Sequence, residues 1–246
     1  MPGPVHYLPI VTTLIAFPFG IILLRRWRER RTGPHLAWWG AGILLYGAGT
    51  ATEAATTLFG WHEPVFRAWY ITGALLGAAP LAQGSVYLHF PRRTAHRLAA
   101  MLVVFVTVAA LFVLASPIDV ARVEPFRLSG NVFAWQRVRL FSPFVNLYAA
   151  VFLIGTAVWS AVRFSRDHGT RHRAMGNVLI AAGAILPGIG GTATRMGHTE
   201  VLYVTELAGL VLIGWGYRLN VRPGAVQARA GTAHAGVLPA TPPTTS

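Results

Sequence analysis

Two glutamates and two arginines lie within, or at the ends of, long apolar stretches of this sequence: Glu53, Arg67, Arg195 and Glu206. A charged group that faces lipid at membrane depth costs at least ~2.5 kcal/mol, so these side chains should face inward and pair with one another or with water. A carboxyl group in that setting can bind a ligand, exchange a proton, or pair with a guanidinium and fix the register of two helices. The sequence leaves these three possibilities open.

Aromatic residues accompany these charges at helical spacing. Tyr46 lies two turns before Glu53, and small residues fill the same helix face between them. Large aromatic side chains next to charged groups are typical of pockets that hold small molecules. We therefore predict a polar ligand-binding pocket formed by Glu53, Arg67, Arg195, Glu206, Tyr46, Trp69, Tyr70 and Tyr203.

The elements that must position these residues are seven apolar stretches, each close to the ~20 residues that a helix needs to cross a membrane. They cover residues 6–24, 36–59, 66–90, 98–116, 143–163, 174–194 and 200–218. The predicted fold class is therefore all-α, a polytopic membrane protein with seven transmembrane helices in one domain, residues 1–222. Residues 223–246 are mostly Ala, Gly, Thr and Pro and predict a disordered cytoplasmic tail.

Orientation follows from the basic residues, all 21 of which are Arg. Fifteen lie in alternate loops and after the last stretch, within residues 25–31, 92–97, 163–173 and 218–229, whereas six lie on the other side. The positive-inside rule then places the N-terminus outside and the C-terminus in the cytoplasm of a bacterial cell with this protein in its inner, cytoplasmic membrane. In that orientation Glu53 and Glu206 lie in the outer part of the membrane, so the pocket should open outward.

Composition excludes several chemistries and partners. The chain has no Cys, no GxSxG nucleophile elbow and no HExxH pair, and its nine His are scattered, so we predict no metal site and favour a protein that is not an enzyme. The net charge of +13 is explained by arginines that flank apolar spans and contact anionic lipid, which argues against nucleic acid as a partner. Expected partners are membrane lipid, a small apolar or amphipathic ligand, and another membrane protein.

Two further features have alternative interpretations. Gly73 and Gly77 have GxxxG spacing and Pro187 interrupts the sixth stretch, which indicates close helix packing or, at Pro187, a ligand-induced hinge. The outer loop of residues 117–141 mixes aromatic, β-branched and Arg residues around Ser129 and Gly130 and predicts either a hairpin or an interfacial segment.

The predicted arrangement resembles that of microbial rhodopsins: it has seven helices and an external N-terminus, with Arg67 at the start of the third helix and Glu206 in the seventh. The retinal lysine of that family would fall at Leu210, and the chain contains no Lys, so a retinal Schiff base is excluded. The runs Tyr46–Glu53 and Arg67–Tyr70 are more similar to those of uncharacterised seven-helix membrane proteins of high-GC bacteria, a resemblance that implies no activity.

Three functional hypotheses follow. The first is a receptor-like or accessory membrane protein that binds a small ligand or lipid in the outward-facing pocket. The second is a membrane-embedded enzyme or proton-coupled carrier in which Glu53 or Glu206 exchanges a proton. The third is a structural subunit of a membrane complex that associates through the helix of residues 98–116 and the GxxxG face.

Overall fold

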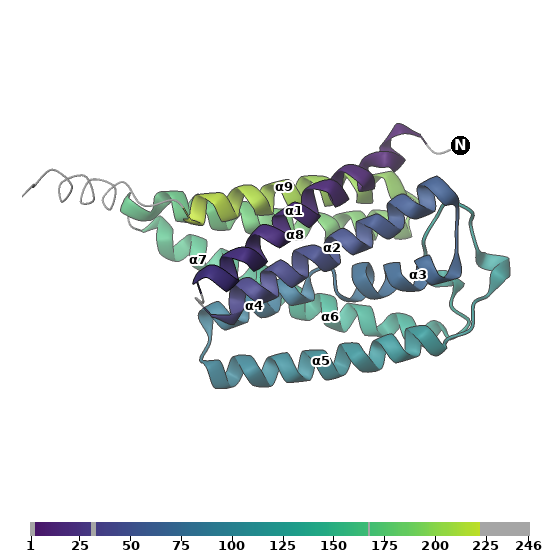
Figure 1. The fold of residues 1–246 in the computed structure, drawn as a ribbon, viewed down its shortest axis with the longest axis horizontal. Helices are drawn as coiled ribbons and strands as arrows, with labels where there is room; N and C mark the ends of the chain where they lie inside the picture. Colours follow the sequence, from purple (N-terminus) through teal and green to yellow (C-terminus); the bar gives the residue numbers. More distant parts are fainter. Residues whose placement is uncertain (1–2, 31–32, 167, 222–246) are drawn as a thin grey trace, which may run out of the picture.

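The computed structural model describes residues 3–30, 33–166 and 168–221, and within these ranges the chain folds into helices without a strand. The predicted disordered tail, residues 223–246, lies outside the described residues. The α-helices are α1 (Leu8–Arg30), α2 (Pro34–Phe59), α3 (Glu63–Trp69), α4 (Ala79–His89), α5 (Arg92–Ala115), α6 (Phe141–Ala149), α7 (Gly155–Ser165), α8 (Arg171–Arg195) and α9 (Thr199–Val221). They form an elongated bundle (Figure 1).

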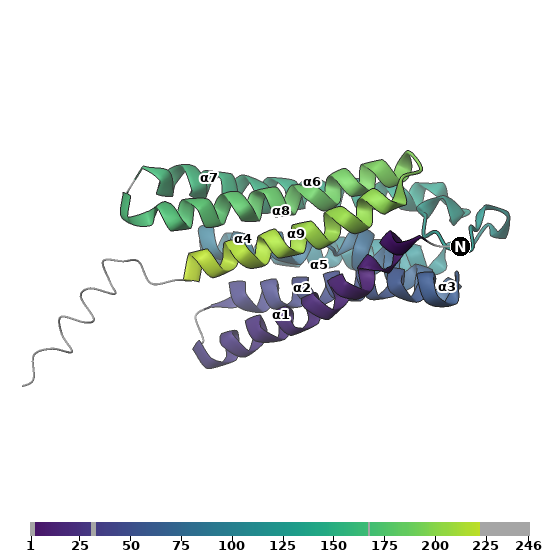
Figure 2. The ribbon, with the colours of Figure 1, turned by 90° about the horizontal axis from the view of Figure 1, so that it is seen from above.

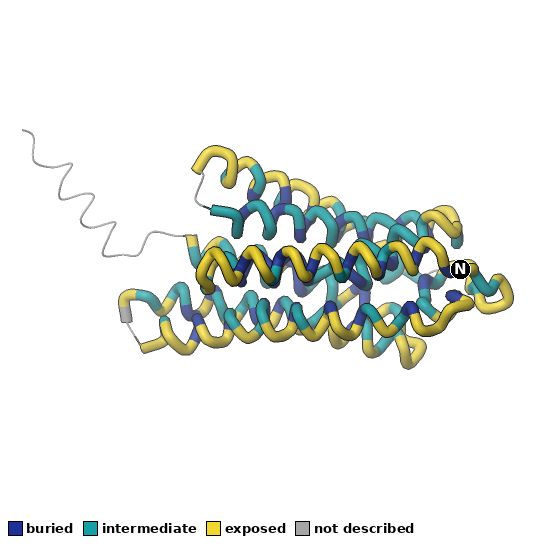
Figure 3. Tube along the Cα trace, turned by 90° about the horizontal axis from the view of Figure 1, so that it is seen from below, coloured by how far each residue is buried: buried dark blue, intermediate teal, exposed yellow. Residues whose placement is uncertain are grey.

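Each predicted apolar stretch corresponds to one helical segment of this bundle. Helices α1, α2, α5, α8 and α9 each cover one stretch, while α3 with α4, and α6 with α7, divide the third and fifth. Six segments are long and apolar enough to cross a membrane, and α2 is not one of these six although it has 26 residues. The prediction of an all-α fold with several helices long and apolar enough to cross a membrane is confirmed. Exposed residues follow the outside of the bundle and buried residues its interior (Figure 3).

The helices extend further into the Arg-rich loops than the apolar stretches do. Helix α1 continues to Arg30, and α8 begins at Arg171. Arginine has a good helix propensity, so the end of an apolar stretch does not end a helix. We call the end of the bundle where α1, α4, α7 and α9 finish and α2, α5 and α8 begin the arginine-rich end. The N-terminus lies at the opposite end (Figures 1 and 2).

The third segment is interrupted next to the predicted site. A π-helical turn, η2 (Tyr70–Leu75), follows α3, and the chain bends through residues 76–78. Helix α4 then begins at Ala79, with Pro80 in its first turn. A Cβ atom on Gly49 of α2 would lie 3.1 Å from the Cα of Gly73 in η2. Glycine at both positions allows the two backbones to approach closely, so Gly73 of the predicted GxxxG pair lies at a helix contact, whereas a Cβ on Gly77 would meet the Gly73 oxygen of its own segment. Pro187 of α8 packs against Gly209 of α9, whose added Cβ would lie 3.2 Å from the proline Cδ.

The long loop between α5 and α6 folds over the end of the bundle opposite the arginine-rich end. Its backbone pairs antiparallel at Ile118 and Phe133, and three short 3-10 turns form the rest. Phe133 is fully buried and packs on Phe66 and Tyr70, with ring centroids 5.0 and 4.9 Å away. A second isolated antiparallel bridge joins Glu124 and Arg127, so the loop shows hairpin-like pairing at two points, and its buried residues belong to the core.

Candidate functional site

Glu53 is a buried carboxyl group in the middle of the bundle. It lies on α2, one turn beyond the close approach of Gly49 to η2, and its residue is 3% exposed. Trp69, the last residue of α3, donates its indole N–H to Glu53 Oε1 over 2.9 Å. The π-helical turn begins at the next residue. A π-helical turn is a local departure from α-helical geometry that is often found at functional sites.

Glu206 on α9 lies next to Glu53 of α2, and the two carboxyl groups are within hydrogen-bond range of each other. The Tyr46 hydroxyl of α2 donates to the Glu206 backbone oxygen over 2.9 Å and so ties α2 to α9 at this level. Oε2 of Glu53 and Oε2 of Glu206 are both buried, and no N–H or O–H of another described residue donates to either. These two oxygens therefore have no donor among the described residues.

Such a contact has a simple chemical requirement. Two ionised carboxylates are acceptors and repel each other, whereas one protonated carboxyl donates a hydrogen bond to its ionised neighbour. In the described part of the chain neither Glu53 nor Glu206 forms an ion pair with an arginine or a histidine. One proton shared between the two groups would remove one negative charge from the interior.

Tyr203 and His6 lie beyond the carboxyl pair, toward the end of the bundle. Tyr203, one turn before Glu206 on α9, is 4% exposed, and its ring packs edge-on against His6 at 5.7 Å. His6 Nε2 lies 3.9 Å from Glu200 Oε1, and the His6 backbone oxygen accepts a hydrogen bond from Thr57. The N-terminal segment therefore packs on Tyr203 and approaches the surface carboxylate of Glu200.

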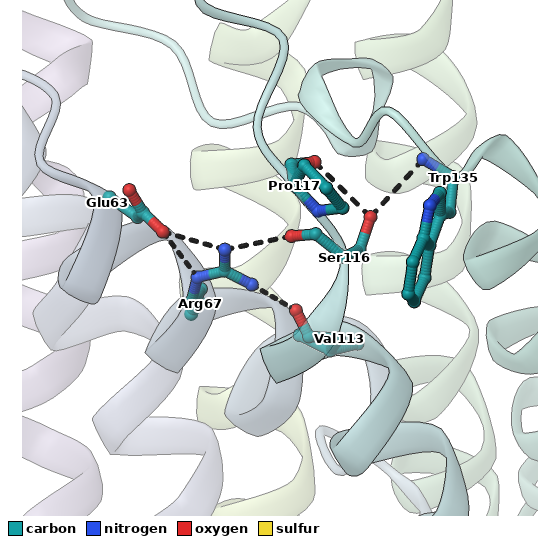
Figure 4. Close-up of polar contacts among 6 residues, drawn as sticks. All are labelled: Glu63, Arg67, Val113, Ser116, Pro117 and Trp135. Atoms are coloured by element: carbon teal, nitrogen blue, oxygen red, sulfur yellow. Dashed lines mark hydrogen bonds and ion pairs between the residues drawn. The ribbon is translucent and has the colours of Figure 1, made fainter.

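Arg67 belongs to a separate polar cluster (Figure 4). Its Nε and Nη2 atoms donate to Glu63 Oε1 over 2.9 and 2.7 Å, one helical turn away on α3. The same guanidinium donates to the backbone oxygens of Val113 and Ser116 at the end of α5, with 2.9 Å to Ser116. These are helix-end carbonyls that lack a partner within their own helix, so Arg67 caps α5.

The pairing of Glu53 and Glu206 with Arg67 and Arg195, one of the arrangements predicted from the sequence, was therefore wrong for Arg67. Helix α3 begins at Glu63 rather than at residue 66. Glu63 and Arg67, which are four residues apart in the sequence, therefore lie one helical turn apart and form an ion pair. Arg195 ends α8 and has no acidic partner among the residues that the structure describes.

Five of the eight predicted site residues gather around the carboxyl pair, on α2, α9 and the end of α3: Glu53, Glu206, Tyr46, Trp69 and Tyr203. Arg67 caps α5, and Tyr70 packs into the aromatic cluster under the long loop. The predicted site is thus smaller and more acidic than the sequence indicated. Its role in binding a ligand stays a prediction.

A cavity of about 540 Å³ lies at the arginine-rich end and was not predicted from the sequence. No single stretch of sequence carries a signal for this cavity, because six helices contribute to its walls: α1, α2, α4, α7, α8 and α9. Leu23, Trp39, Leu81 and Ile180 form part of its apolar lining, and the Tyr217 hydroxyl adds a polar group. This volume is within the range of small-molecule pockets.

No group of three or more His, Asp or Glu side chains gathers at metal-binding distance in the described ranges. The chain matches no protein-family model, no curated protein and no solved structure. The functional argument therefore depends on the geometry of the two sites.

Proposed function

We propose that the protein is a proton-coupled membrane carrier whose functional centre is the pair Glu53 and Glu206, which takes up and releases one proton. The observation that supports this function is the contact between two buried carboxyl groups that have no cationic partner in the described residues. An ionisable group inside a transmembrane bundle is costly unless it is paired, and proton relays in pumps and transporters use such groups. The donor N–H of Trp69 holds Glu53 in place toward its partner.

The proposal includes an orientation. With the N-terminus outside and the arginine-rich end in the cytoplasm, the carboxyl pair lies in the outer part of a bacterial cytoplasmic membrane. His6 and Glu200, at the outer end of the bundle, then mark the exit of the proton to the outer surface. Cysteine introduced at Gly3 and at Asn220 of this Cys-free chain tests the orientation, because an impermeant thiol reagent on intact cells should label the first site and not the second.

Infrared spectroscopy of the protein in lipid bilayers tests the protonation. A protonated carboxylic acid has a C=O stretching band that a carboxylate lacks, and the wild type should show one near neutral pH. Both Glu53→Gln and Glu206→Gln should shift or remove that band, because each breaks the shared hydrogen bond. Glu63→Gln is the matched control, since Glu63 is ion-paired with Arg67 and should contribute no such band.

Proton movement is measured separately in liposomes that contain the purified protein and a trapped pH indicator. An imposed proton gradient should decay faster with the wild type than with either Gln variant, and the Glu63→Gln protein should behave as the wild type does. A band that is unchanged in position and intensity in both Gln variants, or absent from the wild type over the whole accessible pH range, would refute the shared proton. Equal decay for all proteins would refute transport and leave proton binding alone.

Ligand binding at the same cluster is the second candidate, and the aromatic residues around the carboxyl pair favour it. Tyr46, Trp69 and Tyr203 surround the two glutamates and offer ring faces and polar groups to a small molecule. A molecule that copurifies with the wild type at a constant stoichiometry, and is lost from Glu53→Gln and Glu206→Gln but not from Glu63→Gln, would favour this function. Mass spectrometry of the purified proteins provides the measurement.

A further inference from the structure

The cavity at the arginine-rich end combines an apolar interior with several cationic side chains. Its walls include Leu36 and Ile43 of α2, Leu153 of the π-helical turn η6 (Ala150–Ile154) and Ile213 of α9. Arg26, Arg30, Arg163 and Arg173 line the same cavity. A molecule that fits both parts must carry an apolar chain and a negatively charged group.

The four arginines have no acidic partner in the ranges that the structure describes. Three of them instead lie over aromatic rings: Arg26 over Tyr217 at 5.8 Å, Arg163 over Trp159 at 5.5 Å and Arg173 over Phe164 at 5.9 Å. A guanidinium that stacks on a ring keeps its N–H groups at the edge of the plane available for hydrogen bonds. The aromatic residues therefore orient the arginines without neutralising them.

Two buried polar atoms of residues that line this cavity, Arg173 Nε and the Tyr217 hydroxyl, have no hydrogen-bond partner in the part of the chain that the structure describes. A buried donor without a partner costs about 1–3 kcal/mol, so such groups indicate a missing ligand or solvent molecule. By contrast, His89 in the same wall is hydrogen-bonded through Nδ1 to the Ser85 carbonyl and through Nε2 to Ser160, both at 2.9 Å. The donors that remain for a ligand are thus the guanidiniums and the tyrosine hydroxyl.

Arginine recognises phosphate by two parallel hydrogen bonds, which makes an arginine cluster a good match for a phosphodiester. The cavity lies at the ends of membrane-crossing helices, at the level where phospholipid headgroups lie. Its volume of about 540 Å³ holds a headgroup and part of an acyl chain rather than a whole lipid.

We propose that this cavity is a binding site for an anionic phospholipid, with the phosphate held by Arg26, Arg30, Arg163 and Arg173 and one acyl chain lying along the apolar wall. The site is distinct from the carboxyl pair, and the inference does not depend on proton transport. One phosphate would neutralise part of this arginine cluster, in which no arginine forms an ion pair with a carboxylate of the described residues.

Native mass spectrometry with defined lipids tests this proposal on the full chain. Phosphatidylglycerol should bind with a stoichiometry of one at concentrations where phosphatidylcholine of the same chain length does not. Replacing both Arg26 and Arg173 with Gln should weaken phosphatidylglycerol binding by about tenfold or more, since each removes charge-assisted hydrogen bonds. Arg92→Gln with Arg93→Gln is the matched control, because these arginines begin α5 and do not line the cavity.

A second variant fills the cavity instead of changing its charge. Thr156→Trp places a large ring in the wall and should also reduce phosphatidylglycerol binding, while far-ultraviolet circular dichroism and the unfolding midpoint confirm that the protein is folded. Equal losses in the cavity and α5 double variants, or equal binding of the two lipids, would show general attraction to a basic surface and overturn the proposal. Saturable binding of inorganic phosphate that phosphatidylglycerol does not displace would overturn it as well.

Discussion

Replacing Gly209 with Ala should separate α9 from α8 and lower the stability of the bundle. The two helices approach through facing glycines, and a Cβ on Gly209 would lie 2.6 Å from the Gly183 oxygen. Gly176 and Gly216 form an equivalent contact, in which a Cβ on Gly216 would lie 2.4 Å from the Gly176 oxygen. The obstructing atoms belong to the backbone, so no side-chain rotation relieves the clash.

The magnitude follows from this geometry. An ordinary contact between carbon and oxygen is about 3.3–3.6 Å, so the helices must move apart by roughly 0.7–1 Å at Gly209. A gap of that size forfeits about a quarter to a half of the dispersion energy of neighbouring contacts, and overpacking of this kind costs about 1–3 kcal/mol. Higher helix propensity of Ala returns at most about 1 kcal/mol.

Gly191→Ala is the matched control because it changes the same residue type within α8 and an added Cβ there meets nothing within 4 Å. Unfolding of both variants in the same detergent, followed by tryptophan fluorescence, should show a difference of about 1–3 kcal/mol between them, or roughly a 5- to 150-fold change in the folded population. Equal stability of the Gly209→Ala and Gly191→Ala proteins would refute the argument that the glycine contacts hold α8 and α9 together.

Three other predictions concern polar contacts. Arg67→Gln should lower the free energy of unfolding by about 2 kcal/mol because α5 loses its cap, whereas Glu63→Gln should lower it by less than about 1 kcal/mol. Equal losses in denaturant titrations would contradict this prediction. Tyr148→Phe should lower stability by about 1 kcal/mol because the buried Gln83 Oε1 loses its donor, and an unchanged unfolding midpoint would contradict it. Phosphatidylglycerol affinity should change with pH in the wild type and become independent of pH over the same range in Glu206→Gln, as native mass spectrometry at several pH values would show.

The sequence predicted the helical segments well because the cost of exposing polar groups to lipid restricts every span to a long apolar stretch. It also identified Glu53 and Glu206, since few carboxylates occur in those stretches. The partners of these residues were harder to predict. Periodicity places Glu53 on a face of α2, but it does not determine which helix packs against that face.

Two features show where the sequence-based prediction failed. The start of α3 was predicted three residues too late, so the exposed pair of Glu63 and Arg67 was not recognised as one helical turn. The cavity was missed because its arginines come from three different helices and were interpreted as loop charges that set orientation. In each case the missing information is the tertiary placement of helix ends.

The two proposed sites share the same pair of helices, which is why a proton at one should affect a lipid at the other. Tyr46 and Glu53 of α2 meet Glu206 of α9 at the proton site, while Trp39 of α2 and Tyr217 of α9 line the cavity. When the shared proton leaves, two carboxylates repel each other and favour separation of α2 from α9. Because close glycine contacts join α9 to α8, that separation should displace both helices together and with them a wall of the cavity. Such linkage is typically worth about 1–3 kcal/mol and is reciprocal, so bound phospholipid should in turn shift the protonation of the carboxyl pair.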